Sequence, residues 1–197
     1  MNTSRSPQQW RDFIDGCLDF RPEDEVYRVR RSMLTEPELF DLEMELIFEK
    51  TWIYACHESE IRQPNDFITL NAGRQPLIVT RDAQGELHAL VNACAHRGTT
   101  LTRVCKGRQA AFTCPFHAWT YKPDGRLIKV KAPGEYGPGF DLHQHGLKKA
   151  QVASYKGFVF VNLDLTTRLS LEDYLGDAKV FLDLMVEQSP TGELEVL

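Results

Sequence analysis

The chain has no long hydrophobic run: nowhere in its 197 residues do the roughly eighteen apolar residues of a membrane-spanning helix follow one another. Residues 1–7 are mostly polar and lead directly into a helical pattern, so we expect no secretory signal. Internal repeats and low-complexity tracts are also absent. With 42% hydrophobic and 26% charged residues, the composition is typical of a globular protein that does not use a membrane.

The five cysteines lack the even number and regular spacing of a disulfide-stabilised secreted protein. Cys17, Cys56 and Cys105 are widely separated, and we predict that they are free thiols. Free thiols are typical of a reducing compartment, so we expect a cytoplasmic protein.

Two short motifs place the remaining two cysteines beside histidines: Cys94-Ala95-His96 and Cys114-Pro115-Phe116-His117. The C-x-H and C-x-x-H pair is the signature of a Rieske [2Fe-2S] cluster, in which one iron takes two thiolates and the other takes two imidazoles. We therefore assign Cys94 and Cys114 to the first iron, and His96 and His117 to the second. These four residues are the predicted cofactor and metal ligands, and no residue of the chain is predicted to be catalytic.

A structural zinc site is the alternative interpretation, because two cysteines and two histidines also bind zinc. Zinc sites with this ligand set usually pair Cys with Cys and His with His over short gaps, whereas here each short gap joins a Cys to a His. A zinc-stabilised binding module without redox activity would follow from this reading.

Charge is distributed unevenly around these motifs. The formal net charge is -5, which together with the lack of interleaved aromatic residues argues against nucleic-acid binding. Yet residues 97–131 carry a single acid, Asp124, and eight basic residues: Arg97, Arg103, Lys106, Arg108, Lys122, Arg126, Lys129 and Lys131. A basic rim would steer an acidic electron donor, and the same side chains could equally serve only to solvate hairpin surfaces.

Periodicity predicts a mainly β protein: a domain of antiparallel sheets with two cluster-binding hairpin loops, flanked by N- and C-terminal helices. The predicted organisation is a helical arm at 1–50, the β domain at 51–165, and a further helical segment at 166–197. Ser6 and Pro7 predict the start of the first helix, and Thr35 with Glu38 predicts a capping box for the second. Residues 132–150 are rich in Gly and Pro and are predicted to form a long loop.

The chain resembles the N-terminal part of the large (alpha) subunit of Rieske non-haem iron aromatic-ring-hydroxylating dioxygenases. The resemblance runs from about Trp10 to Asp164, and its most specific segments are Phe13 to Pro22, Thr51 to Ile61 and Cys114 to Trp119. These segments are most similar to the benzoate, anthranilate and 2-halobenzoate 1,2-dioxygenase group, with the anthranilate enzymes nearest. The resemblance implies the electron-transfer portion of an aromatic-carboxylate dioxygenase.

The resemblance also implies components outside the chain. Electrons would come from an NADH-dependent reductase with flavin and [2Fe-2S] groups, and would pass to a mononuclear Fe(II) in a catalytic domain that adds O2 to the ring. Residues 166–197 would begin that domain, and neighbouring alpha subunits and a small beta subunit would be partners. The sequence contains no Asp-x-x-His-x-x-x-x-His arrangement, so we expect this chain alone to carry no mononuclear iron.

A stand-alone Rieske ferredoxin is the second functional hypothesis, although such carriers have no use for helices on both sides of the domain. The residue two positions after His117 is Trp119, which has no hydroxyl to donate to the cluster. We therefore expect a reduction potential in the lower part of the roughly -150 to +300 mV Rieske range. Asp141, His143 and His145 lie in the long loop and are predicted to face solvent rather than bind a metal.

Overall fold

The computed structural model describes residues 5–196. The chain forms two compact units, and the boundary between them in the sequence lies between Ile47 and Phe48. Within the described residues, no helix has the length and apolarity that crossing a membrane would require.

The first unit combines short helices with a two-stranded hairpin. Its start confirms the predicted helix: the Ser6 hydroxyl accepts a hydrogen bond from the Gln9 N–H, and Pro7 occupies the first turn. The antiparallel hairpin is a feature that the sequence pattern did not reveal, and Glu25 takes a left-handed backbone (φ 57°) at its turn. The elements are α1 (Pro7–Cys17), β1 (Leu18–Arg21), η1 (Pro22–Asp24), β2 (Val26–Val29), α2 (Ser32–Thr35) and α3 (Pro37–Glu43), followed by the π-helical turn η2 (Met44–Phe48), whose last residue already belongs to the second unit.

The predicted capping box of Thr35 and Glu38 is wrong. Thr35 ends α2, and its hydroxyl donates instead to the Arg31 carbonyl at 3.3 Å. Glu36 is the N-cap residue of α3, with an extended backbone and no side-chain cap. The cause is Pro37, because a proline disfavours helical conformation in the residue before it and is itself tolerated in a first turn.

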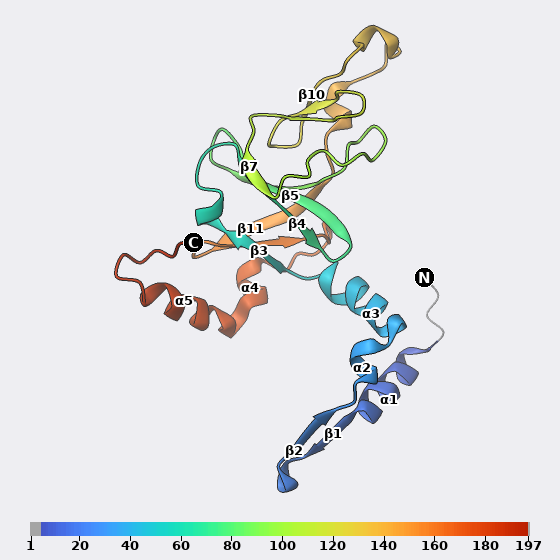
Figure 1. Ribbon diagram of the computed structural model, residues 1–197, viewed down its shortest axis with the longest axis vertical. Helices are drawn as coiled ribbons and strands as arrows, with labels where there is room; N and C mark the ends of the chain where they lie inside the picture. Colours follow the sequence, from blue (N-terminus) through green and yellow to red (C-terminus); the bar gives the residue numbers. More distant parts are fainter. Residues whose placement is uncertain (1–4, 197) are drawn as a thin grey trace. The chain divides into compact units, whose positions relative to one another are not determined.

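The second unit is built on a seven-stranded antiparallel sheet (Figure 1). The strand order is β3-β12-β11-β6-β5-β4-β7. Strands β7 and β11 were absent from the sequence prediction, because β7 is short and highly polar and β11 begins inside the predicted loop. The strands are β3 (Ile53–His57), β4 (Asp66–Ala72), β5 (Gln75–Arg81), β6 (Leu87–Val91), β7 (Lys106–Arg108), β11 (Lys149–Tyr155) and β12 (Phe158–Asn162).

A second, three-stranded antiparallel sheet has the order β10-β9-β8. It consists of β8 (Phe112–Thr113), β9 (Thr120–Tyr121) and β10 (Leu127–Lys129). Figure 1 shows β10 toward one end of this unit and α5 toward the other. The two motif loops connect β6 to β7 and β8 to β9, so each motif lies between two strands. Strands β8 and β9 pair as the predicted hairpin, whereas β6 and β7 are separated in the sheet by β5 and β4, so the first loop is not a hairpin.

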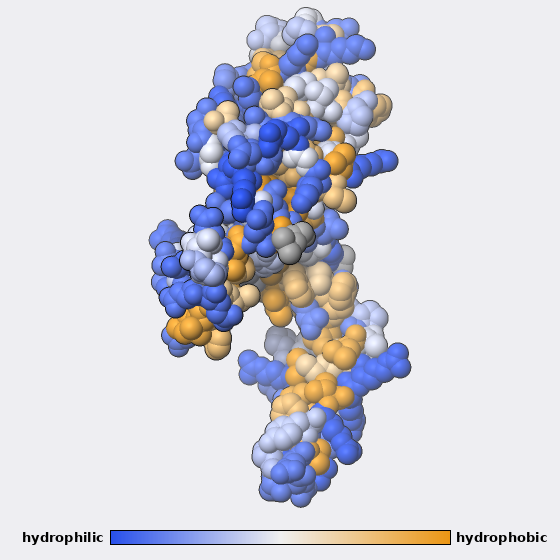
Figure 2. Space-filling view, turned by 60° about the vertical axis from the view of Figure 1, so that its left-hand side comes forward, coloured by the Kyte–Doolittle hydropathy of each residue, from blue (hydrophilic) through white to orange (hydrophobic). Residues whose placement is uncertain are grey.

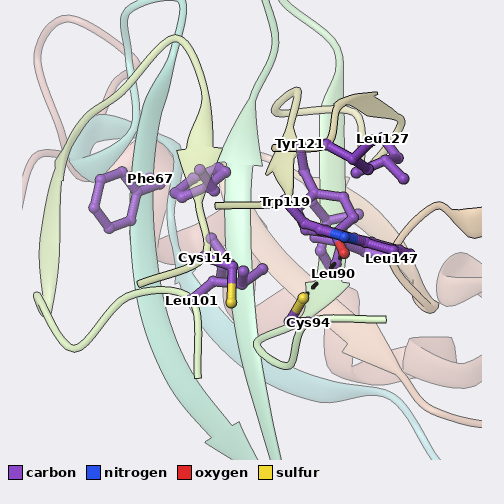
Figure 3. Packing of buried hydrophobic residues seen from close by; sticks show 12 residues of the cluster. Phe67, Leu90, Cys94, Leu101, Cys114, Trp119, Tyr121, Leu127 and Leu147 are labelled. Atoms are coloured by element: carbon purple, nitrogen blue, oxygen red, sulfur yellow. Dashed lines mark hydrogen bonds between the residues drawn. The ribbon is translucent and has the colours of Figure 1, made fainter. Parts of the chain in front are cut away.

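Side chains that alternate along β5 fill two hydrophobic cores. Ile78 belongs to the loop-side core, which also contains Cys94 and Cys114 (Figure 3). Leu77 and Val79 point into the opposite core on the other face of the sheet. The loop-side core therefore joins the large sheet, the small sheet and both motif loops.

Two helices follow the sheet in the same unit, α4 (Leu171–Leu175) and α5 (Lys179–Glu187), joined by η6 (Gly176–Ala178). Trp52 packs with Phe160 and Leu171, and its Nε1–H donates to the Leu169 carbonyl at 3.0 Å. The predicted fold class is confirmed: antiparallel sheets predominate, with helices toward both ends of the chain.

Candidate metal centre

The first motif loop is closed by two backbone hydrogen bonds around Cys94. The Cys94 N–H donates to the Thr99 carbonyl at 2.9 Å, and the Gly98 N–H donates to the Cys94 carbonyl at 2.8 Å. Gly98 has a φ of +72°, a conformation that glycine adopts without steric cost. His96 lies at the tip of this closed turn.

The second loop repeats the same closure. The Cys114 N–H donates to the Trp119 carbonyl at 2.8 Å, the Ala118 N–H donates to the Cys114 carbonyl at 3.0 Å, and Ala118 has a φ of +56°. Each cysteine thus bonds to residues four and five positions later, and the fourth is left-handed in both loops. The sequence does not show that the two loops share this backbone hydrogen bonding, because the left-handed residue is Gly98 in one loop and Ala118 in the other.

Asn92 fixes the base of the first loop. Its buried side-chain amide donates to the Thr102 carbonyl at 2.8 Å and accepts from the N–H groups of Leu101 and Thr102. Its backbone N–H donates to the Pro76 carbonyl at 2.9 Å. Sequence reasoning missed this residue, since an isolated Asn at a strand end carries no distinctive signal.

The structure brings the two predicted histidines together. Their ring centroids lie 4.7 Å apart, although the residues come from different loops. In each ring the Nδ1 atom is buried and has no hydrogen-bond partner. An unpartnered buried ring nitrogen is costly unless it has a ligand, so both atoms fit a role in binding iron. Burial, together with neighbouring His117 and Arg97, lowers the pKa of His96, which favours the neutral imidazole that metals bind.

The two predicted cysteines are each 3% exposed and belong to the loop-side core (Figure 3). The Tyr121 hydroxyl lies 3.2 Å from the Cys94 Sγ and also accepts the Ala95 N–H at 3.1 Å. With its lone pair engaged by Ala95, the hydroxyl is free to donate to sulfur. Burial and the bond to Cys94 raise the pKa of Tyr121, so it remains protonated. This hydroxyl is the sulfur-directed donor that sequence reasoning, which considered only Trp119, missed.

A separate pair of aromatic contacts covers the histidine rings. The Trp119 ring stacks on His96 with centroids 4.9 Å apart and planes 9° apart, and the Phe116 ring stacks on His117 at 3.9 Å. Trp119 is 2% exposed, whereas Phe116 is 60% exposed. The His96 ring is therefore covered by a buried aromatic residue, and the His117 ring by an aromatic residue at the surface.

The donor set can be compared with the two predicted metal centres. Among residues 5–196, no three His, Cys, Asp or Glu side chains converge where a single ion could be held. A tetrahedral zinc site would need all four motif ligands around one ion. A two-iron cluster needs a thiolate pair and an imidazole pair, and the adjacent histidine rings, together with two cysteines in one core, fit that requirement better.

Comparison with known proteins also favours the two-iron cluster over a zinc site. The family model for the Rieske [2Fe-2S] domain matches residues 51–156. The chain belongs to the Rieske [2Fe-2S] domain family. Over 99% of its length it is 70% identical to the anthranilate 1,2-dioxygenase large subunit of Acinetobacter baylyi, and over 94% it is 48% identical to the toluate 1,2-dioxygenase subunit alpha of Pseudomonas putida.

Solved structures show the same likeness. Naphthalene 1,2-dioxygenase from Rhodococcus sp. bound to indole superposes with a TM-score of 0.82 and 35% sequence identity, covering 94% of this chain and 42% of that one. This chain spans only 41% of the length of the anthranilate and toluate dioxygenase subunits. It therefore corresponds to the Rieske portion of much longer proteins.

The remaining histidines of this Rieske chain have structural surroundings. His57 is buried, with its Nδ1 3.0 Å from the Ser59 hydroxyl, and His88 Nε2 lies 2.9 Å from an Asp82 carboxylate oxygen. His143 is exposed, as expected. His145 differs from the prediction, because its ring packs against Trp119 instead of facing solvent freely.

All eight basic residues between positions 97 and 131 of the Rieske domain are exposed. Arg108 pairs with Asp66 at 2.8 Å and Arg126 pairs with Asp124 at 2.7 Å, so these two cations are partly neutralised. The excess of positive charge beside the motif loops persists after these pairs are counted.

Proposed function

We propose that this chain holds a [2Fe-2S] cluster with Cys94 and Cys114 on one iron and His96 and His117 on the other. Held by these four residues, the cluster would supply one-electron transfer between a donor and an acceptor. The observation that carries the assignment is the pair of adjacent histidine rings, each with a buried and unpartnered Nδ1.

The residues of the chain contribute to this role in distinct ways. The backbone hydrogen bonds that close both motif loops fix the positions of the two cysteines. Tyr121 donates to the Cys94 thiolate, and Trp119 excludes water from one face of His96. These features support a preformed site with a defined potential.

We further propose that the chain is the electron-transfer portion of a ring-hydroxylating dioxygenase large subunit, with residues 51–165 as the Rieske domain. Residues 166–197 would begin the catalytic domain that carries the mononuclear Fe(II), and residues 1–50 would form a separate arm. Exposed apolar side chains support this: Phe181 of α5 is 70% exposed, and Figure 2 shows hydrophobic residues gathered on the first unit, where Leu34 is 81% exposed. A stand-alone ferredoxin would have no use for such surfaces.

The substrate we propose is an aromatic carboxylate of the anthranilate type. Identity decreases from the anthranilate subunit (70%) through the toluate (48%) and 2-halobenzoate (40%) subunits to the benzene dioxygenase subunit (34%). The three highest values belong to enzymes named for aromatic carboxylates. Because the ring-binding pocket would lie outside this chain, the identity gradient is the support for this choice.

The partners we propose are an NADH-dependent flavin and [2Fe-2S] reductase, neighbouring alpha subunits and a small beta subunit. Exposed basic residues beside the motif loops support an acidic electron donor. We place the protein in the cytoplasm, because Cys17, Cys56 and Cys105, which the proposed cluster does not use, form no disulfide.

The cluster assignment is tested by metal and acid-labile sulfide analysis together with a visible spectrum of the purified chain. We expect a brown protein, and His96→Ala or His117→Ala should lose the colour and the ability to accept an electron. His143→Ala is the matched control, since His143 is exposed and outside the site, and it should stay coloured. A colourless wild-type protein that contains zinc would contradict the assignment.

The substrate proposal needs the longer protein with its reductase. Oxygen consumption and product analysis with anthranilate, benzoate and benzene would rank the substrates, and we expect anthranilate to be used best. Preferential turnover of benzene would contradict the proposal.

A further inference from the structure

The stack of Trp119 on His96 joins the two motif loops. Trp119 follows the second loop, two residues after His117, yet its ring lies nearly parallel to His96 of the first loop. Planes 9° apart and centroids 4.9 Å apart mean that the indole is stacked, with an offset, against one face of the imidazole. Rotation of His96 about its side-chain bonds would push its ring into this indole.

Trp119 is in turn held by a hydrogen bond from outside both loops. Its Nε1–H donates to the Tyr136 hydroxyl at 2.9 Å. By contrast, the Nε1 of Trp10 is buried with no partner at all. The bond to Tyr136 therefore fixes the in-plane orientation of the indole, which packing alone leaves less determined.

Tyr136 belongs to a segment that surrounds Trp119 with aromatic rings. We call residues 132–146 the aromatic strap. Its rings of Tyr136, Phe140 and His145 have centroids 6.0, 5.7 and 5.8 Å from that of Trp119, all at steep angles. The strap thus meets the edges of the indole while His96 meets its face.

The aromatic strap is internally ordered despite its Gly/Pro-rich composition. It contains the 3-10 turns η4 (Pro133–Glu135) and η5 (Leu142–His145). Tyr136 and Phe140 stack at 4.4 Å, and the His145 Nδ1 lies 2.7 Å from the Asp141 carbonyl oxygen. Where the strap ends, the Leu147 N–H donates to the Gly125 carbonyl at 2.8 Å, which ties it to the hairpin that follows β9.

We propose that the aromatic strap is a positioning device for the cluster: Tyr136 holds Trp119, and Trp119 holds the imidazole of His96 in one plane and keeps water from it. This inference rests on the proposed role of His96 as an iron ligand. His117 lacks such a device, because the aromatic residue stacked on it, Phe116, is 60% exposed. The two imidazoles are therefore constrained to different degrees.

Loosening the contact between Trp119 and His96 should change the reduction potential of the cluster in one direction. The reduced cluster carries one more negative charge than the oxidised cluster, and water stabilises the more highly charged form. Loosening Trp119 admits water at His96, which favours reduction and raises the potential. The strap therefore helps to keep the potential low.

The test uses Tyr136→Phe and Trp119→Phe in the full chain, each with a matched control. Tyr155→Phe removes another hydroxyl that makes hydrogen bonds, to Asp183 at 3.0 Å, and Trp52→Phe removes the N–H of another buried tryptophan. Iron and sulfide content, redox titration and pulsed EPR of the reduced protein would be measured for all four. Pulsed EPR resolves the nitrogen couplings of the two imidazoles separately.

We expect Tyr136→Phe and Trp119→Phe to keep both irons, to increase the equilibrium constant for reduction by about three- to tenfold, and to alter one imidazole coupling only. A tenfold change corresponds to about 59 mV for a one-electron couple. Both controls should match the wild type. Phe116→Leu should leave the His96 coupling unchanged, because Phe116 stacks on the other ring.

Two results would overturn the inference. In the first, Tyr136→Phe keeps its cluster but shows the wild-type potential and couplings. In the second, Tyr136→Phe loses iron while Tyr155→Phe retains it, since a residue that only orients His96 is not needed to hold the metal. A wild-type protein without iron would instead reject the proposed function itself, so the two failures are distinct.

Discussion

The Tyr121 hydroxyl lies 3.2 Å from the Cys94 Sγ, and it receives the Ala95 N–H on its other side. A hydroxyl in this position stabilises negative charge on sulfur, and that charge increases when an iron–sulfur cluster is reduced. Tyr121 therefore raises the potential, while the buried surroundings supplied by Trp119 lower it. The measured value should reflect both effects.

Removing this hydroxyl gives the first prediction. Tyr121→Phe should lower the reduction potential, because the reduced form loses more stabilisation than the oxidised form. We expect about a tenfold change in the equilibrium constant, or about 59 mV, measured by redox titration. An unchanged potential in a fully loaded variant would show that the hydroxyl does not donate to sulfur.

The site shows what local sequence can and cannot predict. Motif spacing is a local property, and it predicted four residues of which the structure places the two histidine rings side by side and the two cysteines in one core; their role as ligands stays a prediction. Tyr121 was not predicted, since a tyrosine in a short strand looks like any other strand residue until the fold places it beside Cys94. The aromatic strap was read as loop from its composition, and its contact between Tyr136 and Trp119 depends on tertiary packing.

The fold also contains elements that the local sequence indicates and elements that depend on tertiary pairing. The central strand β5 contains a run of β-branched and apolar residues at 77–80, a local signal for a strand, and its two faces fill separate cores. Strand β7 was not predicted, because its three residues, Lys106–Arg108, are exposed and have no apolar pattern. The strand is defined by its pairing with β4. The break before Pro37 was predictable in principle, since the proline outweighs a capping pattern that spans it.

Arg81 gives a prediction about stability. Its side chain, 14% exposed, donates hydrogen bonds to the Ile61 carbonyl (2.7 Å), the Gly85 carbonyl (2.6 Å) and a Glu58 carboxylate (2.7 Å). Lysine keeps the charge but cannot reach three separate acceptors from one nitrogen. Arg81→Lys should therefore lower the free energy of unfolding by about 2 kcal/mol, measured by urea denaturation.

Arg108 is the matched control for this substitution. It also pairs with a carboxylate, that of Asp66 at 2.8 Å, but its side chain is 61% exposed. Arg108→Lys should cost less than about 1 kcal/mol, because an exposed ion pair contributes little. Equal losses in the two variants would mean that burial and the carbonyl acceptors of Arg81 are unimportant.

Asp82 gives a prediction about pH. Burial raises the pKa of Asp82, but hydrogen bonds from the His88 ring and from the Glu86 and Gln84 N–H groups outweigh it, so the pKa is lowered. A lowered pKa in the folded state stabilises the fold above the unfolded value of about 3.9, and this stabilisation is lost as the pH falls through the folded value.

Asp82→Asn should therefore lower the free energy of unfolding by about 1–3 kcal/mol at neutral pH, and the difference from wild type should shrink at about pH 3. Urea denaturation at both pH values measures this. Asp177→Asn, at an exposed position, should have little effect at either pH. A difference that stays constant between the two pH values would contradict the assigned role of the carboxylate.

Two glycines with nearly the same backbone conformation allow steric and conformational costs to be separated. Gly157 has a φ of +87° and Gly85 a φ of +90°. A Cβ on Gly157 would lie 2.5 Å from the buried His57 Nε2, whereas a Cβ on Gly85 would meet nothing within 4 Å. Gly85→Ala should cost about 1–2 kcal/mol from the left-handed backbone alone.

Gly157→Ala should cost about 1–3 kcal/mol more than Gly85→Ala, because it adds a clash with His57 in a packed region. The Gly157 carbonyl also accepts the Glu58 N–H at 2.8 Å, so the backbone there cannot move away without losing that bond. Thermal and urea unfolding of the two variants measure the difference, and the double variant Gly157→Ala with His57→Ala should recover part of it. If both glycine variants lose the same stability, the close approach of His57 to the Gly157 backbone does not constrain the fold.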